Sequence, residues 1–160
     1  MALTRISNQS LTSVTALPAA ISTGKVLQCV NNNYTTSATS NSQNTYVTSS
    51  TCDITITNAS SKILLLANFN IDGNGCNALY RINKVISGTT TTLYTSPSWF
   101  FRNNGSDLID QMPFINFLHT HGSSVGTTIT YQTQVTWNQG ANTISLNNSA
   151  TSHQTLMEIL

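Results

Sequence analysis

The stretch 61–71, Ser-Lys-Ile-Leu-Leu-Leu-Ala-Asn-Phe-Asn-Ile, is the one sustained apolar run in this chain. With a period of two, one face is apolar throughout and carries Ile63, Leu65, Ala67, Phe69 and Ile71. The other face begins with Leu64 and Leu66 and ends with Asn68 and Asn70. Turn-type residues bound the run at 58–60 and 72–75, so the pattern predicts a strand in the middle of a sheet. A helix is the less favoured alternative, because Asn and Ile are poor helix formers.

The clearest alternation lies in residues 127–137, and it predicts a second long strand. Its inward positions are Ile129, Tyr131, Thr133, Val135 and Trp137. Shorter strands are predicted at 25–30, 52–56, 76–85, 89–94, 114–121, 143–146 and 154–160. Strand 76–85 is expected to pair back on the central run, and the polar residues 31–44 are expected to form a loop. Eight to ten short strands are typical of an antiparallel β-sandwich, with a jelly roll as one form of it.

Composition supports an all-β class. Thr, Ser and Asn together make up 65 of the 160 residues, whereas charged residues are 7%. Thr suits strand surfaces, and Ser and Asn suit turns. The length predicts one sandwich domain, residues 25–160, and residues 1–24 have a different character.

Residues 1–24 are predicted to form an attachment arm, extended or partly helical. Their apolar side chains are spaced by three to five residues between Ser and Thr: Leu3, Ile6, Leu11, Val14, Leu17 and Ile21. Pro18 argues against one long helix, so we expect the arm to order by docking on another surface. The alternative is a frayed terminus without a role.

Charge and apolar content exclude several partners and locations. A formal net charge of +1 without a basic cluster gives no basis for binding nucleic acid. No apolar block follows Arg5 and no run approaches the ~20 residues of a membrane span, so we expect neither a signal peptide nor membrane insertion. Cys29, Cys52 and Cys76 form no Cys-x-x-Cys pair, and buried free thiols in a protein made in the cytoplasm are expected.

Candidate chemistry is sparse, and no catalytic residue or cofactor is predicted. His119 and His121 alternate along a predicted strand and are weak candidates for a metal site around a threefold axis, with a polar or interface role as the alternative. Asp107 and Asp110 are the one close carboxylate pair; glycoside hydrolysis needs two carboxylates across a cleft, but turn capping is the favoured role here. The chain is therefore expected not to be an enzyme.

An aromatic cluster, Trp99-Phe100-Phe101, follows Pro97. Aromatic faces stack on sugar rings, but such clusters more often lie in a core or a subunit interface. An interface is favoured because the chain is poor in charge, and contact with a glycan is the alternative.

Several segments in order resemble small virion structural proteins of tailed bacteriophages that infect marine or freshwater bacteria such as cyanobacteria. They are Leu17-Pro18, 24–28, 60–64, Arg81, Asp110 before Pro113, 130–135 and 155–159. The resemblance covers nearly the whole chain but consists of strand and turn patterns. It implies a trimeric jelly-roll domain on a short N-terminal attachment segment, in a tail fibre, a head fibre or a capsid decoration. The chain has no long shaft or coiled coil, which puts a long-fibre role in doubt.

The leading hypothesis is therefore a non-enzymatic protein of a virion, a homotrimer anchored to capsid or tail proteins by its arm. A domain that binds host-surface carbohydrate through loops 31–44 and 97–106 is the alternative. A depolymerase acting through Asp107 or Asp110 is the third hypothesis.

Overall fold

The computed structural model describes residues 25–73, 76–102, 109–140, 143–148 and 150–160. These residues form thirteen strands and no helix, and none of them provides a helix suited to crossing a membrane. The strands are β1 Val26–Tyr34, β2 Ala38–Ser40, β3 Val47–Thr55, β4 Lys62–Asn68, β5 Ile71–Gly73, β6 Cys76–Ile86, β7 Thr89–Thr95, β8 Phe101–Arg102, β9 Ile109–Gln111, β10 Phe114–His119, β11 Thr128–Gly140, β12 Ile144–Leu146 and β13 Ser152–Ile159. The predicted arm, residues 1–24, lies outside the described residues.

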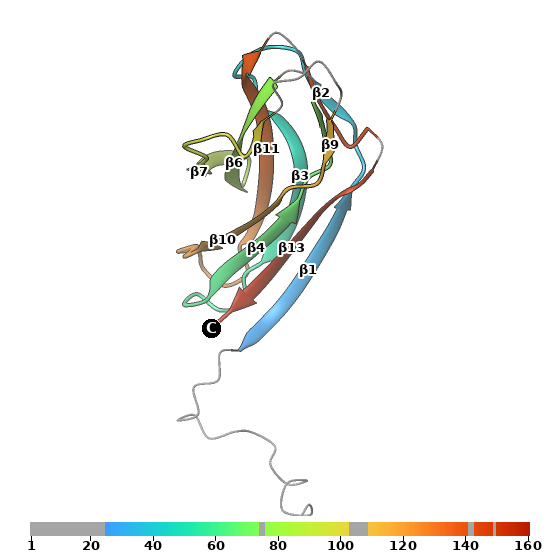
Figure 1. The fold of residues 1–160 in the computed structure, drawn as a ribbon. Coiled ribbons are helices and arrows are strands. Elements are labelled where there is room, and N and C mark those ends of the chain that lie inside the picture. Colours follow the sequence, from blue (N-terminus) through green and yellow to red (C-terminus); the bar gives the residue numbers. More distant parts are fainter. Residues whose placement is uncertain (1–24, 74–75, 103–108, 141–142, 149) are drawn as a thin grey trace, which may run out of the picture.

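Two antiparallel sheets face each other (Figure 1). The first has the strand order β1-β13-β4-β10, and the second has the order β3-β11-β6-β7, with β8 paired to β6. Apart from the hairpin β6–β7, the long strands alternate between the sheets along the chain. Strand β1 pairs with β13, the last strand. This is the strand order of a jelly roll, and it confirms the predicted all-β antiparallel sandwich.

A third sheet continues the first one. Its order, β2-β12-β5-β9, repeats the order β1-β13-β4-β10, and each of its strands is next in sequence to the matching strand of the first sheet. Asn147 lies at the bend between β12 and β13 with a φ of 56°. Its Nδ2 donates to the carbonyl oxygens of Thr36 (3.0 Å) and Ser49 (3.1 Å), and its backbone N–H donates to Asn70 (3.1 Å). The bend is thus held by hydrogen bonds from one side chain and its own backbone.

The core lies between the first and second sheets. The inward residues predicted for the central run are buried, as are those predicted for 127–137. These are Ile63, Leu65, Ala67, Phe69 and Ile71, facing Ile129, Tyr131, Thr133, Val135 and Trp137. Because side chains of a strand alternate between its faces, both predictions of the buried face are confirmed.

Part of this interior is polar. Gln154 of β13 accepts a hydrogen bond from Ser50 of β3 (2.7 Å) and donates to the carbonyl oxygen of Tyr131 (3.1 Å). The Ser50 hydroxyl also contacts that of Thr133, and all of these side chains are buried. Buried polar groups are tolerated when each has a hydrogen-bond partner, so a sequence rich in Ser and Thr can still form a packed interior.

Three predictions are wrong. Strand β6 pairs with β11 and β7, because β13 and β10 occupy both edges of the central strand β4. Residues 31–44 are not all loop: β1 continues to Tyr34, and β2 covers Ala38–Ser40. Asn31 and Asn32 extend β1 by donating to Thr155 Oγ1 (3.0 Å) and the Thr51 carbonyl oxygen (2.7 Å). Cys29, expected to be buried, is exposed, whereas Cys52 is buried; the side chain of Cys76 lies outside the described residues.

Ser87 and Gly88 form a tight hairpin turn between two paired strands. These two residues join β6 to β7 with φ values of 49° and 80°. Two positive φ angles in a two-residue loop match the twist of antiparallel strands, and Gly adopts such angles without steric cost.

Candidate functional site

The outer face of the sheet β1-β13-β4-β10 carries a group of apolar side chains, called here the apolar outer face. The strand registers place Cys29 opposite Met157, Met157 opposite Leu64, and Leu64 opposite Leu118. Directly opposed residues share a face, so these four form one row across the sheet. The face consists of Val26, Cys29, Leu64, Leu66, Phe114, Leu118, Met157 and Ile159.

Much of this face is open to solvent. Phe114 is 62% exposed, Val26 55% and Leu118 51%. An irregularity in the register between Val26 and Gln28 lets Val26 and Cys29 point to the same side. Lys62 is the only Lys, Arg, Asp or Glu among the described outward positions of this sheet.

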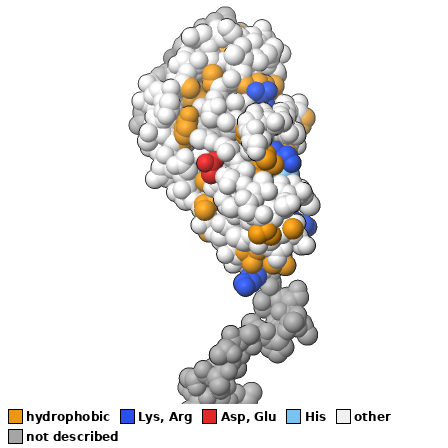
Figure 2. Space-filling view, turned by 180° about the vertical axis from the view of Figure 1, so that it is seen from behind, with side chains coloured by type: hydrophobic (Ala, Val, Ile, Leu, Met, Phe, Trp, Pro, Cys, Tyr) orange, Lys and Arg blue, Asp and Glu red, His pale blue; other side chains and the backbone are white. Residues whose placement is uncertain are grey.

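The second sheet is different on its outside. Its outward positions on β11 are Thr128, Thr130, Gln132 and Gln134. Figure 2 shows the molecule from behind: most of the surface is white, and the hydrophobic side chains lie in separate small groups. The outside of the first sheet also carries Asn31, Asn33, Asn68, Asn116, His153 and Thr155, but it is more apolar than the outside of β11. Its apolar group is the candidate site for contact with another protein.

A hollow of about 240 Å³ lies in the apolar outer face beside Phe114. It is lined by Leu66, Ala67, Asn68, Phe114, His153 and Thr155. Asn68 Oδ1 accepts from the backbone N–H of His153 (2.9 Å), so part of the polar rim is already satisfied. Its size and lining suit one apolar side chain of a partner.

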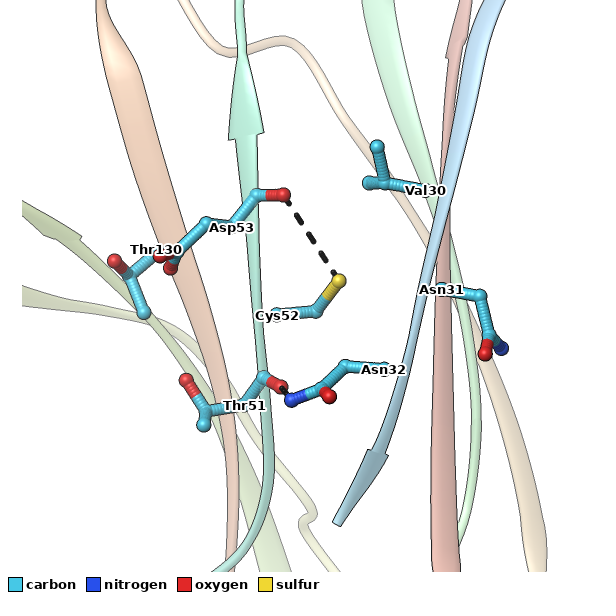
Figure 3. Close-up of a pocket in the computed structure, with 7 residues that line it drawn as sticks. All are labelled: Val30, Asn31, Asn32, Thr51, Cys52, Asp53 and Thr130. Atoms are coloured by element: carbon cyan, nitrogen blue, oxygen red, sulfur yellow. Dashed lines mark hydrogen bonds between the residues drawn. The ribbon is translucent and has the colours of Figure 1, made fainter.

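A larger hollow, about 470 Å³, lies where β1 of the first sheet passes β3 of the second (Figure 3). It is lined by Val30, Asn31, Asn32, Thr51, Cys52, Asp53 and Thr130. The amide of Asn32 is engaged with the carbonyl oxygen of Thr51. Burial, followed by the charge of Asp53, raises the pKa of the Cys52 thiol to about 11, so at neutral pH this thiol is protonated and a poor nucleophile.

Ser61, His121 and Glu158 form a buried cluster that the sequence analysis missed. Ser61 Oγ lies 2.6 Å from Glu158 Oε1 and 3.1 Å from His121 Nε2. His121 Nδ1 accepts from the backbone N–H of Ser123 (2.9 Å), so in the neutral ring the proton is on Nε2, which donates to Ser61. A general base needs an unprotonated nitrogen facing the hydroxyl. This cluster therefore does not activate Ser61 as a nucleophile.

Glu158 organises the loop that leads into β4. It accepts hydrogen bonds from the backbone N–H groups of Thr57 and Asn58, the Thr57 hydroxyl (2.7 Å), Ser61 and Gln28 Nε2 (2.6 Å). Burial alone would raise its pKa, but these donors, with Ser61 first, outweigh it and lower the pKa to about 2. No spacing rule points to this cluster; the one sequence clue was a Glu on the inward side of the last strand.

Each of the two candidate metal ligands has hydrogen-bond partners within the domain. His119 lies at the end of β10, and its Nδ1 is 2.7 Å from the buried hydroxyl of Tyr131. Burial, followed by Lys84 and then His121, lowers the pKa of His119 to about 4. His121 lies beyond the strand, not within it as predicted, and both of its ring nitrogens have partners. Within the described ranges, no three His, Cys, Asp or Glu side chains are placed to hold a metal ion.

The aromatic cluster does not form one platform. Phe100 packs edge-on against Tyr80 (5.1 Å between ring centroids) and Phe69 (5.9 Å). Trp99 is 37% exposed and donates from Nε1 to Asn138 Oδ1 (2.7 Å). It borders a hollow of about 340 Å³ together with Leu79, Pro97, Ser98 and Asn138. The side chain of Phe101 lies outside the described residues.

The remaining candidates also lie outside them. The described residues do not include Asp107, the arm residues Leu3 to Ile21, or the side chain of Asp110. The backbone of Asp110 belongs to β9, where it pairs with Asp72 of β5.

Comparison with known proteins gives a likeness of fold. No family model and no curated protein matches this chain. Two solved structures of infectious bursal disease virus are similar to it: the Gx strain, at 14% identity over 84% of this chain with a TM-score of 0.45, and the virus-derived T=1 particles, at 10% identity over 83% with a TM-score of 0.42. The chain spans about a third of each of those chains, 32% and 36%. At these scores the likeness does not assign a function.

Proposed function

We propose that this chain is a non-enzymatic structural protein of a virion, an oligomer, a trimer by the resemblance, that decorates the capsid or forms a short fibre. Residues 1–24 attach it to other virion proteins. It is made in the host cytoplasm and needs no metal or cofactor. The sequence resemblance to small virion proteins of tailed phages motivates this role, and the apolar outer face is the structural observation that supports it.

Leaving an apolar face exposed to water costs free energy. Single exposed apolar side chains are ordinary, but a contiguous group across four paired strands marks a surface for association. The row Cys29, Met157, Leu64 and Leu118 meets this description. A protein whose task is assembly needs such a surface, and a single-copy enzyme does not.

The polar clusters support a structural role. Ser61 and His121 are 1% and 3% exposed, so a substrate would not reach them, and the His121 proton faces the Ser61 hydroxyl. The hydrogen bonds of Glu158 fasten a loop to the last strand. These interactions stabilise the sandwich, and neither Ser61 nor His121 is placed to react with a substrate.

The mass of the purified full chain tests the proposal. Light scattering should give a multiple of 17.3 kDa, three copies in the trimer. Replacing Phe114 and Leu118 together by Ser should lower that mass, because the oligomer would lose apolar contacts. The matched control is Val125→Ser, since Val125 is 62% exposed and lies outside the apolar outer face. A single-copy species at high concentration that turns over a substrate would refute the proposal.

A second candidate function, binding of host-surface carbohydrate, is favoured by Trp99. This indole is partly exposed beside a hollow that also contains the Asn138 amide, and sugars bind where an aromatic face and an amide meet. Full-length protein on a glycan array should then bind a defined sugar, and Trp99→Ala should abolish binding whereas Val125→Ala should not. Absence of binding at high protein concentration would remove this candidate.

A further inference from the structure

We infer that the apolar outer face is the binding site for residues 1–24 of a neighbouring copy of this chain. The inference rests on the proposed function and narrows it: the virion protein to which residues 1–24 attach is the next copy of this chain, so the arm of one copy docks on the domain of its neighbour. Four observations support it: the character of the segment, its point of attachment, the area of the face and the hollow beside Phe114.

The segment and the face match in chemistry. Residues 1–24 contain one charged side chain, Arg5, and six apolar residues separated by Ser, Thr, Ala and Pro. The face offers Lys62 as its single Lys, Arg, Asp or Glu at the described outward positions. Docking therefore buries apolar side chains on both sides while leaving few charges to be desolvated.

The point of attachment favours a neighbouring copy. The carbonyl oxygen of Lys25 accepts from the backbone N–H of Leu160 (3.0 Å), so at Lys25 the chain still runs in line with β1, directed away from the sheet. Return to the face of the same copy would need the segment to reverse its direction. Twenty-four residues can span up to roughly 80 Å, far more than the ~14 Å across four strands, so the face of a neighbour is within reach.

The area of the face argues against direct contact between two such faces. Four strands ~4.8 Å apart and about seven residues long cover a plane of roughly 450 Å². Stable interfaces bury about 800 Å² per partner. An extended segment requires less area and can follow the row from Cys29 to Leu118.

The hollow beside Phe114 provides a specific contact. Its volume of about 240 Å³ has room for a Leu or Ile side chain beside Leu66 and Phe114, with Asn68, His153 and Thr155 around it. A peptide that binds a flat apolar sheet gains register from one such anchor.

Photo-crosslinking of the full chain tests the inference. A photoreactive amino acid replaces Leu17, and labelled protein with this substitution is mixed with isotopically heavy wild-type chains before illumination. Crosslinks should join residue 17 to heavy peptides that contain Leu64 and Leu66, Phe114 to Leu118, or Met157. Crosslinks to the Thr and Gln face of β11, or to the face of the same copy, would overturn it.

Labelling of Cys29 provides a second measurement. Cys29 is exposed in the described domain and lies in the apolar row, so a docked arm should cover it. The rate of maleimide modification of Cys29, followed by mass spectrometry, should rise at least tenfold in the Leu17→Asp, Ile21→Asp variant. The matched control Val125→Asp should leave the rate unchanged, and equal rates in wild type and arm variant would contradict the inference.

The two proposals fail separately. If the arm variant labels at the wild-type rate while the full chain is oligomeric and joins particles, the docking site is wrong and the virion role stands. If the full chain is single-copy and catalytic, the virion role fails, and the docking inference fails with it.

Discussion

The hydroxyl of Ser61 lies 2.6 Å from a carboxylate oxygen of Glu158, and this contact joins the start of β4 to the end of β13. Glu158 is fully buried and still ionised, because every donor around it points at its oxygens. The loop 57–61 is thereby folded around one carboxylate.

Glu158→Gln should destabilise the domain by about 2–4 kcal/mol, because an amide places donors against the N–H groups of Thr57 and Asn58 and loses charge-assisted bonds. Denaturant unfolding measures the change. Asp53→Asn, at an exposed carboxylate, is the control and should change stability by less than about 0.5 kcal/mol. Similar midpoints for the two variants would mean that Glu158 contributes little.

The low pKa of Glu158 predicts a loss of stability in acid. Its folded-state pKa, about 2, is below the ordinary value of 4.5, so the folded state binds its proton less readily than the unfolded chain. The contribution is present in full above pH 4.5 and is lost as the pH falls to about 2. Unfolding midpoints measured across this range should fall more steeply for wild type than for Glu158→Gln.

His119 predicts a second loss at higher pH. Its folded-state pKa is about 4 against an ordinary 6.5, so between these values the unfolded chain takes up a proton that the folded domain does not. Stability should fall as the pH decreases from 6.5 to 4, in a window that lies above that of Glu158 and overlaps it only near pH 4 to 4.5. The groups that face His119 are the Tyr131 hydroxyl, Lys84 and His121. In the His119→Gln variant, stability should depend less on pH in this range. An unchanged slope would mean that another group causes the dependence.

The two faces of the sheet β1-β13-β4-β10 should respond differently to truncation. Leu65 is fully buried, and Leu65→Ala should cost about 2–5 kcal/mol by leaving a cavity. Leu118→Ser, on the apolar outer face opposite Leu64, should change the unfolding of the separated subunit by less than about 1 kcal/mol but weaken association. Unfolding and oligomer mass are measured on the same samples. A large loss of subunit stability in Leu118→Ser would mean that this face is part of the core.

Asn147 combines a positive φ with three hydrogen bonds of its side chain. Asn147→Ala and Asn147→Gly both remove the donors to Thr36 and Ser49 and the contact with Ser152. Gly adopts a φ of 56° without strain, whereas Ala does not. The Asn147→Ala variant should therefore be less stable than the Asn147→Gly variant by about 1–2 kcal/mol. Equal stabilities would show that the bend relaxes once the side chain is lost.

Local alternation was enough to identify the buried faces. Period-two patterns identified the inward residues of β4 and β11, because which side chains share a face depends on the strand itself. The same alternation holds in β10, where Phe114 and Leu118 lie on one face and Ile115 and Phe117 on the other. The patterns missed β2, β5 and β9, which have three residues each, since such short strands depend on their neighbours for hydrogen bonds.

The sequence by itself determined the all-β class, an antiparallel sandwich and the inward faces of β4 and β11, because these follow from composition and alternation within short segments. Tertiary structure decided which strands are neighbours. Pairing β4 with β13 and β10 depends on contacts between residues far apart in the chain, for which no local pattern exists. The same pairing places Cys29, Met157, Leu64 and Leu118 in one row on the outside of the sheet. It also brings the hydrogen-bond donors of residues 57–61 within reach of the Glu158 carboxylate.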